Sequence, residues 1–121
     1  MPFKVVYNKE HECLRGTVNG NFEADHVRAY VREVERIAKK HKCKRFLNDF
    51  RKANIHLSIL NLYEVPDKVV EEEFNRSWKR AILINETDFE KMSFLETTSF
   101  NSGIPLRVFT SEDEAIEWLH S

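Results

Sequence analysis

The sequence predicts an α/β domain in which a mixed sheet of about five strands is flanked by about four helices. Short apolar stretches of strand length alternate with longer segments whose apolar residues have the spacing of an amphipathic helix. The first two strands are separated only by a short polar segment, which indicates an antiparallel hairpin. The later strands are separated by helices, which indicates mostly parallel pairing through right-handed crossovers.

The opening hairpin is predicted from strands at 3–7 and 13–18, joined by the polar segment 8–12. A long helix is predicted over 23–41, because apolar residues recur there at three- and four-residue spacing. The lysines at its end suit the partial negative charge of the last carbonyl groups. The buried stripe of this helix is formed by Val27, Tyr30, Val31, Val34, Ile37 and Ala38.

The middle of the chain predicts two more strands and a helical region between them. A strand at 45–50 is followed by a helical region from 58 to about 74, which Pro66 divides into two pieces because proline disfavours helical geometry at the preceding residue. The strand at 79–85 contains the unbroken apolar run 81–84, which is typical of a central strand covered on both faces.

The last third of the chain predicts two helices that flank a short strand. Thr87 and Glu90 have the spacing of a capping box and predict the start of a helix that ends near Gly103. A strand at 106–110 follows. Ser111 is the predicted N-cap of the terminal helix, with Glu114 at the capping-box position.

Composition bounds the size and class of the protein. With 121 residues, 41% of them hydrophobic, the chain is expected to form one domain over 1–121. Its 19 lysines and arginines nearly balance its 20 acidic residues, so no overall charge favours nucleic acid or an anionic membrane. We expect a cytoplasmic protein, since no signal peptide is recognisable and the longest charge-free run, 53–63, is too short to span a bilayer.

The common catalytic and cofactor motifs are absent from this sequence. Its three glycines do not have the spacing of a P-loop or of a dinucleotide-binding fingerprint. Its five histidines form neither an HExxH pair nor a zinc-type cluster with cysteine. No nucleophile elbow is present. Cys13 and Cys43 are too sparse for a disulfide scaffold and are expected to be reduced, partly buried thiols. We therefore expect no cofactor and no metal site, and these motifs give no support for a catalytic triad.

Polar residues gather where the predicted parallel strands end. In an open α/β sheet the carboxyl ends of such strands share one edge, and ligands bind beside that edge. The segments 49–51, 85–87 and 110–111 follow predicted strands in this way. The turn from 49 to 58 is expected at the centre of the shared edge. The candidate ligand-binding residues are Asp49, Arg51, Ser58, Asn85 and Thr110.

Asp49 and Arg51 have both a functional and a structural interpretation. Alternate strand residues share a face, so both side chains are expected on one side of the strand, opposite Asn48 and Phe50. Asp49 could then act as a base while Arg51 holds a phosphate or carboxylate. The alternative is that the two side chains pair and anchor the loop. Glu96, on the predicted third helix, has the same two interpretations.

Two further segments leave alternatives open. Leu57, Leu60 and Tyr63 belong to a segment denser in apolar residues than one buried stripe requires, so some of them could cover a pocket or contact a partner, a second copy of the chain included. Core burial is the other explanation. The basic run 39–45 lacks aromatic residues for base stacking and is interpreted as a solvated helix end, not a nucleic-acid site.

Four segments have a familiar arrangement, namely the strand at 45–51, the segment 57–66, the stretch 96–103, and an ending over 107–119 in which a strand leads into a capped helix. With them, essentially the whole chain resembles the SpoIIAA-like (STAS/SEC14-type) proteins. The resemblance implies a mixed sheet flanked by helices, a bacterial or archaeal cytoplasmic setting, and binding of a regulatory protein or of a small, lipid-like ligand.

One departure from this family concerns phosphorylation. Sporulation anti-anti-sigma factors have an Asp-Ser-Ser-Gly type motif with a phosphorylated serine after the equivalent strand, and the segment 49–58 lacks it. Ser58 could still occupy a comparable helix start, where phosphate would be favoured by the free amide groups. The alternative is an unmodified N-cap serine.

Three functions follow as hypotheses. The first is a noncatalytic regulatory or protein-interaction domain. The second is a domain that binds a small apolar or anionic ligand between the 49–51 edge and the 57–63 segment. The third is an enzyme that uses Asp49 or Glu96 as an acid or base.

Overall fold

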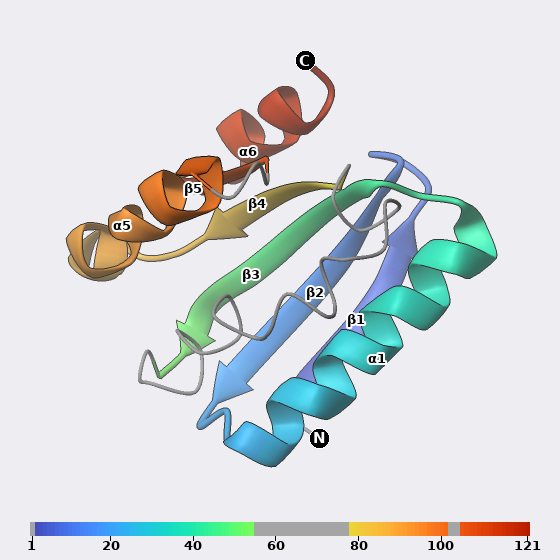
Figure 1. Cartoon of the computed structure of the whole chain (residues 1–121), viewed down its shortest axis with the longest axis horizontal. Helices are drawn as coiled ribbons and strands as arrows, with labels where there is room; N and C mark the ends of the chain where they lie inside the picture. The colour runs from blue at the N-terminus through green and yellow to red at the C-terminus, as the bar shows by residue number, and fades with distance from the viewer. Residues whose placement is uncertain (1, 55–77, 102–104) are drawn as a thin grey trace.

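The structure, a computed structural model, describes residues 2–54, 78–101 and 105–121. One sheet has the strand order β1-β2-β3-β4-β5 (Figure 1). Its strands are β1 (Phe3–Asn8), β2 (Cys13–Gly20), β3 (Arg45–Ala53), β4 (Lys79–Leu83) and β5 (Leu106–Phe109). The helices of the described residues are α1 (Ala24–His41), α5 (Glu86–Asn101) and α6 (Glu112–Leu119). The α/β class and the five-stranded mixed sheet are confirmed.

The pairing of the strands is the one that the sequence predicts. β1 and β2 are antiparallel, with Phe3 opposite Val18 and Asn8 opposite Cys13, and Glu12 adopts a left-handed conformation (φ 48°) in the turn between them. The remaining neighbours, β2 with β3, β3 with β4 and β4 with β5, are all parallel. The carboxyl ends of four strands therefore lie at one edge of the sheet.

Helix α1 covers one face of the sheet over β1 and β2 (Figure 1). Its N-cap is Glu23, whose side chain accepts from the backbone of His26 while the His26 ring accepts from the backbone of Glu23. Lys42 ends the helix in a left-handed conformation (φ 52°). The main core lies beneath α1 and includes Val18, Phe22, Tyr30, Ala38, Phe50 and Ile82.

Helix α6 covers the opposite face and packs mainly on β4. Ser111 is its N-cap, as predicted, since the Ser111 hydroxyl accepts from the backbone amide of Glu114 at 3.4 Å. The smaller core on this face is formed by Cys13, Leu47, Ala81, Leu83, Phe109, Ala115 and Leu119.

Several predicted boundaries were wrong by a few residues. Strand β3 continues to Ala53, three residues beyond its predicted end, because β2 keeps pairing with it as far as Gly20. Helix α5 begins at Glu86, so Thr87 lies inside the helix and is not its N-cap. The helical region predicted from 58 to 74 lies outside the described residues. No helix in the described ranges is long and apolar enough to cross a bilayer.

A buried polar contact links α1 to the centre of the sheet. The Tyr30 hydroxyl donates to Asn48 Oδ1 at 2.8 Å, and Asn48 Nδ2 donates to the carbonyl of Ala81 at 3.3 Å. Gly16, on β2 beside Asn48, makes room for this contact, because a Cβ at Gly16 would lie 2.1 Å from the Tyr30 hydroxyl. The contact therefore joins α1 to β3 and β4.

Candidate functional site

The two faces of β3 carry different chemistry. Asn48 and Phe50 point toward α1, where Asn48 bonds to Tyr30 and Phe50 lies in the main core. Asp49 and Arg51 lie on the other face, the one that α6 covers in part. This division follows from the alternation of side chains along a strand and agrees with the prediction.

Asp49 is held on both carboxylate oxygens by two arginines. Its Oδ1 accepts from the backbone amide of Arg51 at 3.1 Å and from Arg51 Nε at 3.0 Å. Its Oδ2 accepts from Arg51 Nη2 at 2.8 Å and from Arg15 Nη2 at 2.9 Å. Arg51 therefore forms a two-pronged contact with Asp49, and Arg15 adds a second positive charge from β2.

Glu112 joins the same group from the first turn of α6. Its Oε1 lies 2.6 Å from Arg15 Nη2 and 3.5 Å from Arg51 Nη2. Asp49 is buried, whereas the side chains of Arg51 and Glu112 are 41% and 37% exposed. We call these four residues, Arg15, Asp49, Arg51 and Glu112, the rim network.

The rim network makes Asp49 unsuitable as a general base. Burial by itself raises the pKa of the Asp49 carboxyl, but hydrogen bonds from the side chain and backbone of Arg51 and the positive charges of Arg51 and Arg15 outweigh it. The pKa of Asp49 consequently lies below its usual value, and the pKa of Arg51 is raised by the same hydrogen bond. A carboxylate in this state holds its partners and has little affinity for a proton at neutral pH.

The other predicted site residues have separate positions. Asn85 Nδ2 donates to the carbonyl of Arg51 at 2.7 Å, so it supports the backbone beside the rim network. Thr110 is exposed at the end of β5, one residue before the N-cap of α6. The candidates Ser58, Leu57, Leu60 and Tyr63 lie outside the described residues, and so does the ligand pocket predicted beside 57–63.

Two members of the rim network were missed from the sequence. Arg15 follows Cys13 by two positions in a strand, so the sequence predicts only that the two side chains share a face of the sheet. That spacing does not indicate which acidic residue lies next to Arg15. Glu112 follows the N-cap Ser111 and was treated only as part of a helix start. A search for charged residues next to each strand end would have found Glu112. It would not have shown that Glu112 pairs with Arg15 and Arg51.

Glu96 has a structural partner on a different element. Its Oε1 accepts from the backbone amide of Val108 at 2.7 Å, so α5 supplies an acceptor to β5. β5 is the last strand of the sheet, and an edge strand presents backbone donors that could pair with another chain. Glu96 thus occupies a backbone donor on the edge strand β5. Because its carboxylate has this structural partner, the geometry does not support the interpretation of Glu96 as a catalytic acid or base.

We expect Glu96→Ala to lower the free energy of unfolding by about 1–2 kcal/mol, because the buried amide of Val108 loses its acceptor. Urea titration measures this change, and hydrogen exchange of the Val108 amide should become faster. Glu90→Ala, at an exposed position of the same helix, is the matched control and should change stability by less than about 0.5 kcal/mol. Equal effects of the two substitutions would contradict this role of Glu96.

In the part of the chain that the structure describes, the cysteines and the acidic residues give no sign of nucleophilic or metal chemistry. Cys13 and Cys43 are both free and buried, a step beyond the partial burial that was expected. Burial, together with the neighbouring Cys43, raises the pKa of Cys13 to about 11, which leaves almost no thiolate at neutral pH. Within the described ranges no three His, Cys, Asp or Glu side chains are grouped to hold a metal ion.

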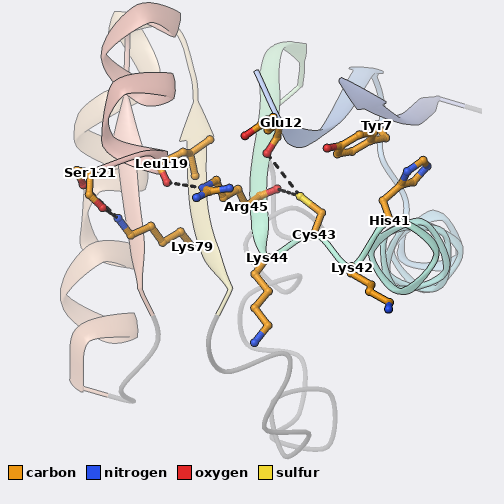
Figure 2. Close-up of a pocket in the computed structure, with 10 residues that line it drawn as sticks. All are labelled: Tyr7, Glu12, His41, Lys42, Cys43, Lys44, Arg45, Lys79, Leu119 and Ser121. Atoms are coloured by element: carbon orange, nitrogen blue, oxygen red, sulfur yellow. Dashed lines mark hydrogen bonds between the residues drawn. The ribbon is translucent and has the colours of Figure 1, made fainter. Parts of the chain in front are cut away.

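A cavity of about 440 Å³ lies at the opposite edge of the sheet from the rim network (Figure 2). It is formed where β3 and β4 begin and where α1 and α6 end. Its lining includes His41 and Lys42 from the end of α1, Arg45 and Lys79 from the strands, and Leu119 from α6. The prediction from sequence did not consider this edge, because the basic run 39–45 was interpreted as a solvated helix end.

Comparison with known proteins identifies the fold. No protein-family model and no curated protein matches the chain. The structure is similar to that of an uncharacterized DUF3478-family protein from Shewanella loihica PV-4, whose crystal structure has a SpoIIAA-like fold. The TM-score is 0.62 at 13% sequence identity, over 97% of this chain and 91% of the other. The chain therefore has a SpoIIAA-like fold, as the resemblance in sequence implied.

Proposed function

We propose that this chain is a noncatalytic protein-interaction domain whose contact surface is the outer part of the rim network, Arg51 and Glu112. The observation that carries the proposal is the state of Arg51. Three hydrogen bonds to Asp49 hold it in place, yet its side chain is still 41% exposed. A charged group that is already ordered loses little conformational entropy when a partner binds.

The chemistry of the rim network favours binding over turnover. Asp49 is ionised and saturated with donors, so it cannot readily exchange a proton with a substrate. Arg51 and Glu112 present opposite charges side by side, which suits a partner with a carboxylate for Arg51 and a cation for Glu112. Arginine is also among the residues enriched in protein interfaces and in their hot spots.

Site-specific crosslinking tests the proposal. A photo-crosslinking residue is placed at Thr110, which is exposed at the same edge, and the chain is expressed in its native cells. We expect one dominant crosslinked protein, identified by mass spectrometry. The yield of that product should fall about fivefold or more in Arg51→Ala, since hot-spot arginines contribute more than about 1 kcal/mol.

Arg36→Ala is the matched control. Arg36 pairs with Glu33 in an exposed ion pair on α1, away from the rim network, so its loss should leave the crosslink unchanged. Circular dichroism of both variants shows whether each remains folded. The proposal fails if no defined protein is crosslinked from Thr110, or if Arg51→Ala and Arg36→Ala give the same yield.

A further inference from the structure

The cavity at the starting edge of β3 and β4 has a strongly positive lining. Among the lining residues that the structure describes, Lys42, Lys44, Arg45 and Lys79 are basic and Glu12 is the one acidic side chain. The chain as a whole is nearly neutral, with a formal net charge of -1. The excess of positive charge is therefore local. Lys42, Lys44 and Arg45 belong to the basic run 39–45, and the fold adds Lys79 from β4.

Two of these cations are held by the end of α6. Arg45 Nε donates to the carbonyl of Leu119 at 3.0 Å. Lys79 Nζ donates to the carbonyl of Trp118 at 3.1 Å and to that of Ser121 at 2.8 Å. The bonds to Trp118 and Leu119 satisfy carbonyl groups at the end of the helix, whose combined partial charge is only about half an elementary charge, and the bond to Ser121 lies just beyond the helix. Two full positive charges exceed that requirement, and they are ordered before any ligand arrives.

The remaining walls include contacts between lining residues. The rings of Tyr7 and His41 stack at 4.2 Å, and the Cys43 thiol donates to the carbonyl of Arg45 at 3.4 Å (Figure 2). Lys42 occupies the left-handed cap position and is one of the lining residues, with its side chain directed away from Arg45 and Lys79. The volume, about 440 Å³, lies within the range of small-molecule sites, roughly 300–1,000 Å³.

From these observations we infer that the cavity is a binding site for a small phosphate-bearing anion, with Arg45 and Lys79 as its principal cations and Lys42 as a further cation at its margin. A doubly charged phosphate group compensates several cations at once. The planar guanidinium of Arg45 suits phosphate oxygens, and lysines bind them as point charges. The site is separate from the rim network, which lies at the other end of the same strands.

Amide chemical shifts test the inference and locate the ligand. The ¹⁵N-labelled chain is titrated with inorganic pyrophosphate, and we expect saturable shifts for the amides of Lys42, Cys43 and Lys79. The amide of Arg51, at the far edge, is the internal reference and should not move. Succinate, a dicarboxylate without phosphate, and a short DNA duplex are titrated in parallel at the same ionic strength.

A pair of substitutions isolates the charge from the fold. Lys42→Asn removes a cation and keeps a residue that tolerates the left-handed conformation, so the cap of α1 is preserved. Pyrophosphate affinity should fall about threefold, as expected for one exposed charge contact. Lys52→Asn, at an exposed position near the opposite edge, removes the same charge and should leave the affinity unchanged.

Four outcomes overturn the inference. They are the absence of saturable shifts with pyrophosphate, equal affinities in Lys42→Asn and Lys52→Asn, equal binding of succinate, and tighter binding of the DNA duplex. Absent shifts or equal affinities would show that the cations serve only the helix ends. Equal binding of succinate would indicate a general anion site, and tighter binding of the duplex would indicate a contact with nucleic acid. None of these results bears on the crosslink from Thr110.

Discussion

Asp49→Asn is expected to lower the free energy of unfolding by about 2–3 kcal/mol. The substitution keeps the shape of the side chain but removes the charge that faces Arg15 and Arg51. Of the described acidic residues that pair with these two arginines, Glu112 remains. Breaking a buried ion pair costs about 3–5 kcal/mol. The expected loss is smaller because Arg51 is partly exposed to solvent. Urea denaturation of both proteins at neutral pH measures the difference.

The same ion pairs predict a pH dependence of stability. The pKa of Asp49 is lower in the folded chain than in the unfolded chain, so the unfolded chain binds more protons as the pH falls. The contribution of Asp49 is therefore complete above the unfolded value, about pH 4, and is lost as the pH falls through the folded pKa. The stabilities of the wild type and of Asp49→Asn should converge in this acidic range.

Asp113→Asn is the matched control for both measurements. Asp113 is an exposed acid in the first turn of α6, so its replacement should cost only a few tenths of a kcal/mol, from the helix dipole. If Asp49→Asn were as mild as Asp113→Asn at neutral pH, the rim network would not contribute to stability. If the wild type and Asp49→Asn lost stability in parallel below pH 4, the lowered pKa of Asp49 would be refuted.

Gly16→Ala is the second substitution with a large expected effect, about 3 kcal/mol of destabilisation. The new methyl group would lie 2.1 Å from the Tyr30 hydroxyl and 2.9 Å from the ring carbon that bears it. Tyr30 cannot easily move away, because it is buried and donates to Asn48. Overpacking of a filled core costs about 1–3 kcal/mol, and displacement of the hydroxyl also weakens a buried hydrogen bond. Thermal and urea unfolding measure the loss.

A double-mutant cycle with Tyr30→Phe identifies the cause. Tyr30→Phe alone should cost about 1–2 kcal/mol, because Asn48 Oδ1 loses its donor in the core. In the Gly16→Ala background the same substitution removes the atom closest to the new methyl group, so it should cost less or even stabilise the protein. Additive effects would mean that contact with the Tyr30 hydroxyl is not the source of the strain.

Gly20→Ala separates this steric effect from the effect of backbone conformation. Gly20 has a positive φ of 63°, and a Cβ there would meet no atom within 4 Å. An alanine at this position should cost about 1–2 kcal/mol through its left-handed backbone alone. Tyr30→Phe should not relieve that cost, so the two glycines should respond differently in the same cycle.

Local sequence was enough to predict the class of the fold and most of its elements. The apolar stripe of α1, the short turn of the hairpin and the N-cap Ser111 are each determined by residues within a few positions of one another. Boundaries failed where a neighbouring strand decided them, as when β2 extended the pairing of β3 to Ala53. The alternation that separates Asp49 from Asn48 is equally local, and it was predicted correctly.

Pairings between distant residues were decided only by the tertiary structure. Asp49 meets Arg15 across 34 positions and Arg45 meets the end of α6 across 74, and nothing near either residue specifies its partner. Whether Asp49 is a base or an anchor depends on those partners, because the charges around a carboxyl group set its pKa. The composition of this chain is almost neutral, yet folding places Lys79 beside the basic run 39–45 in one cavity. Sequence determines which charges exist, and the packing of the strands and helices determines which of them meet.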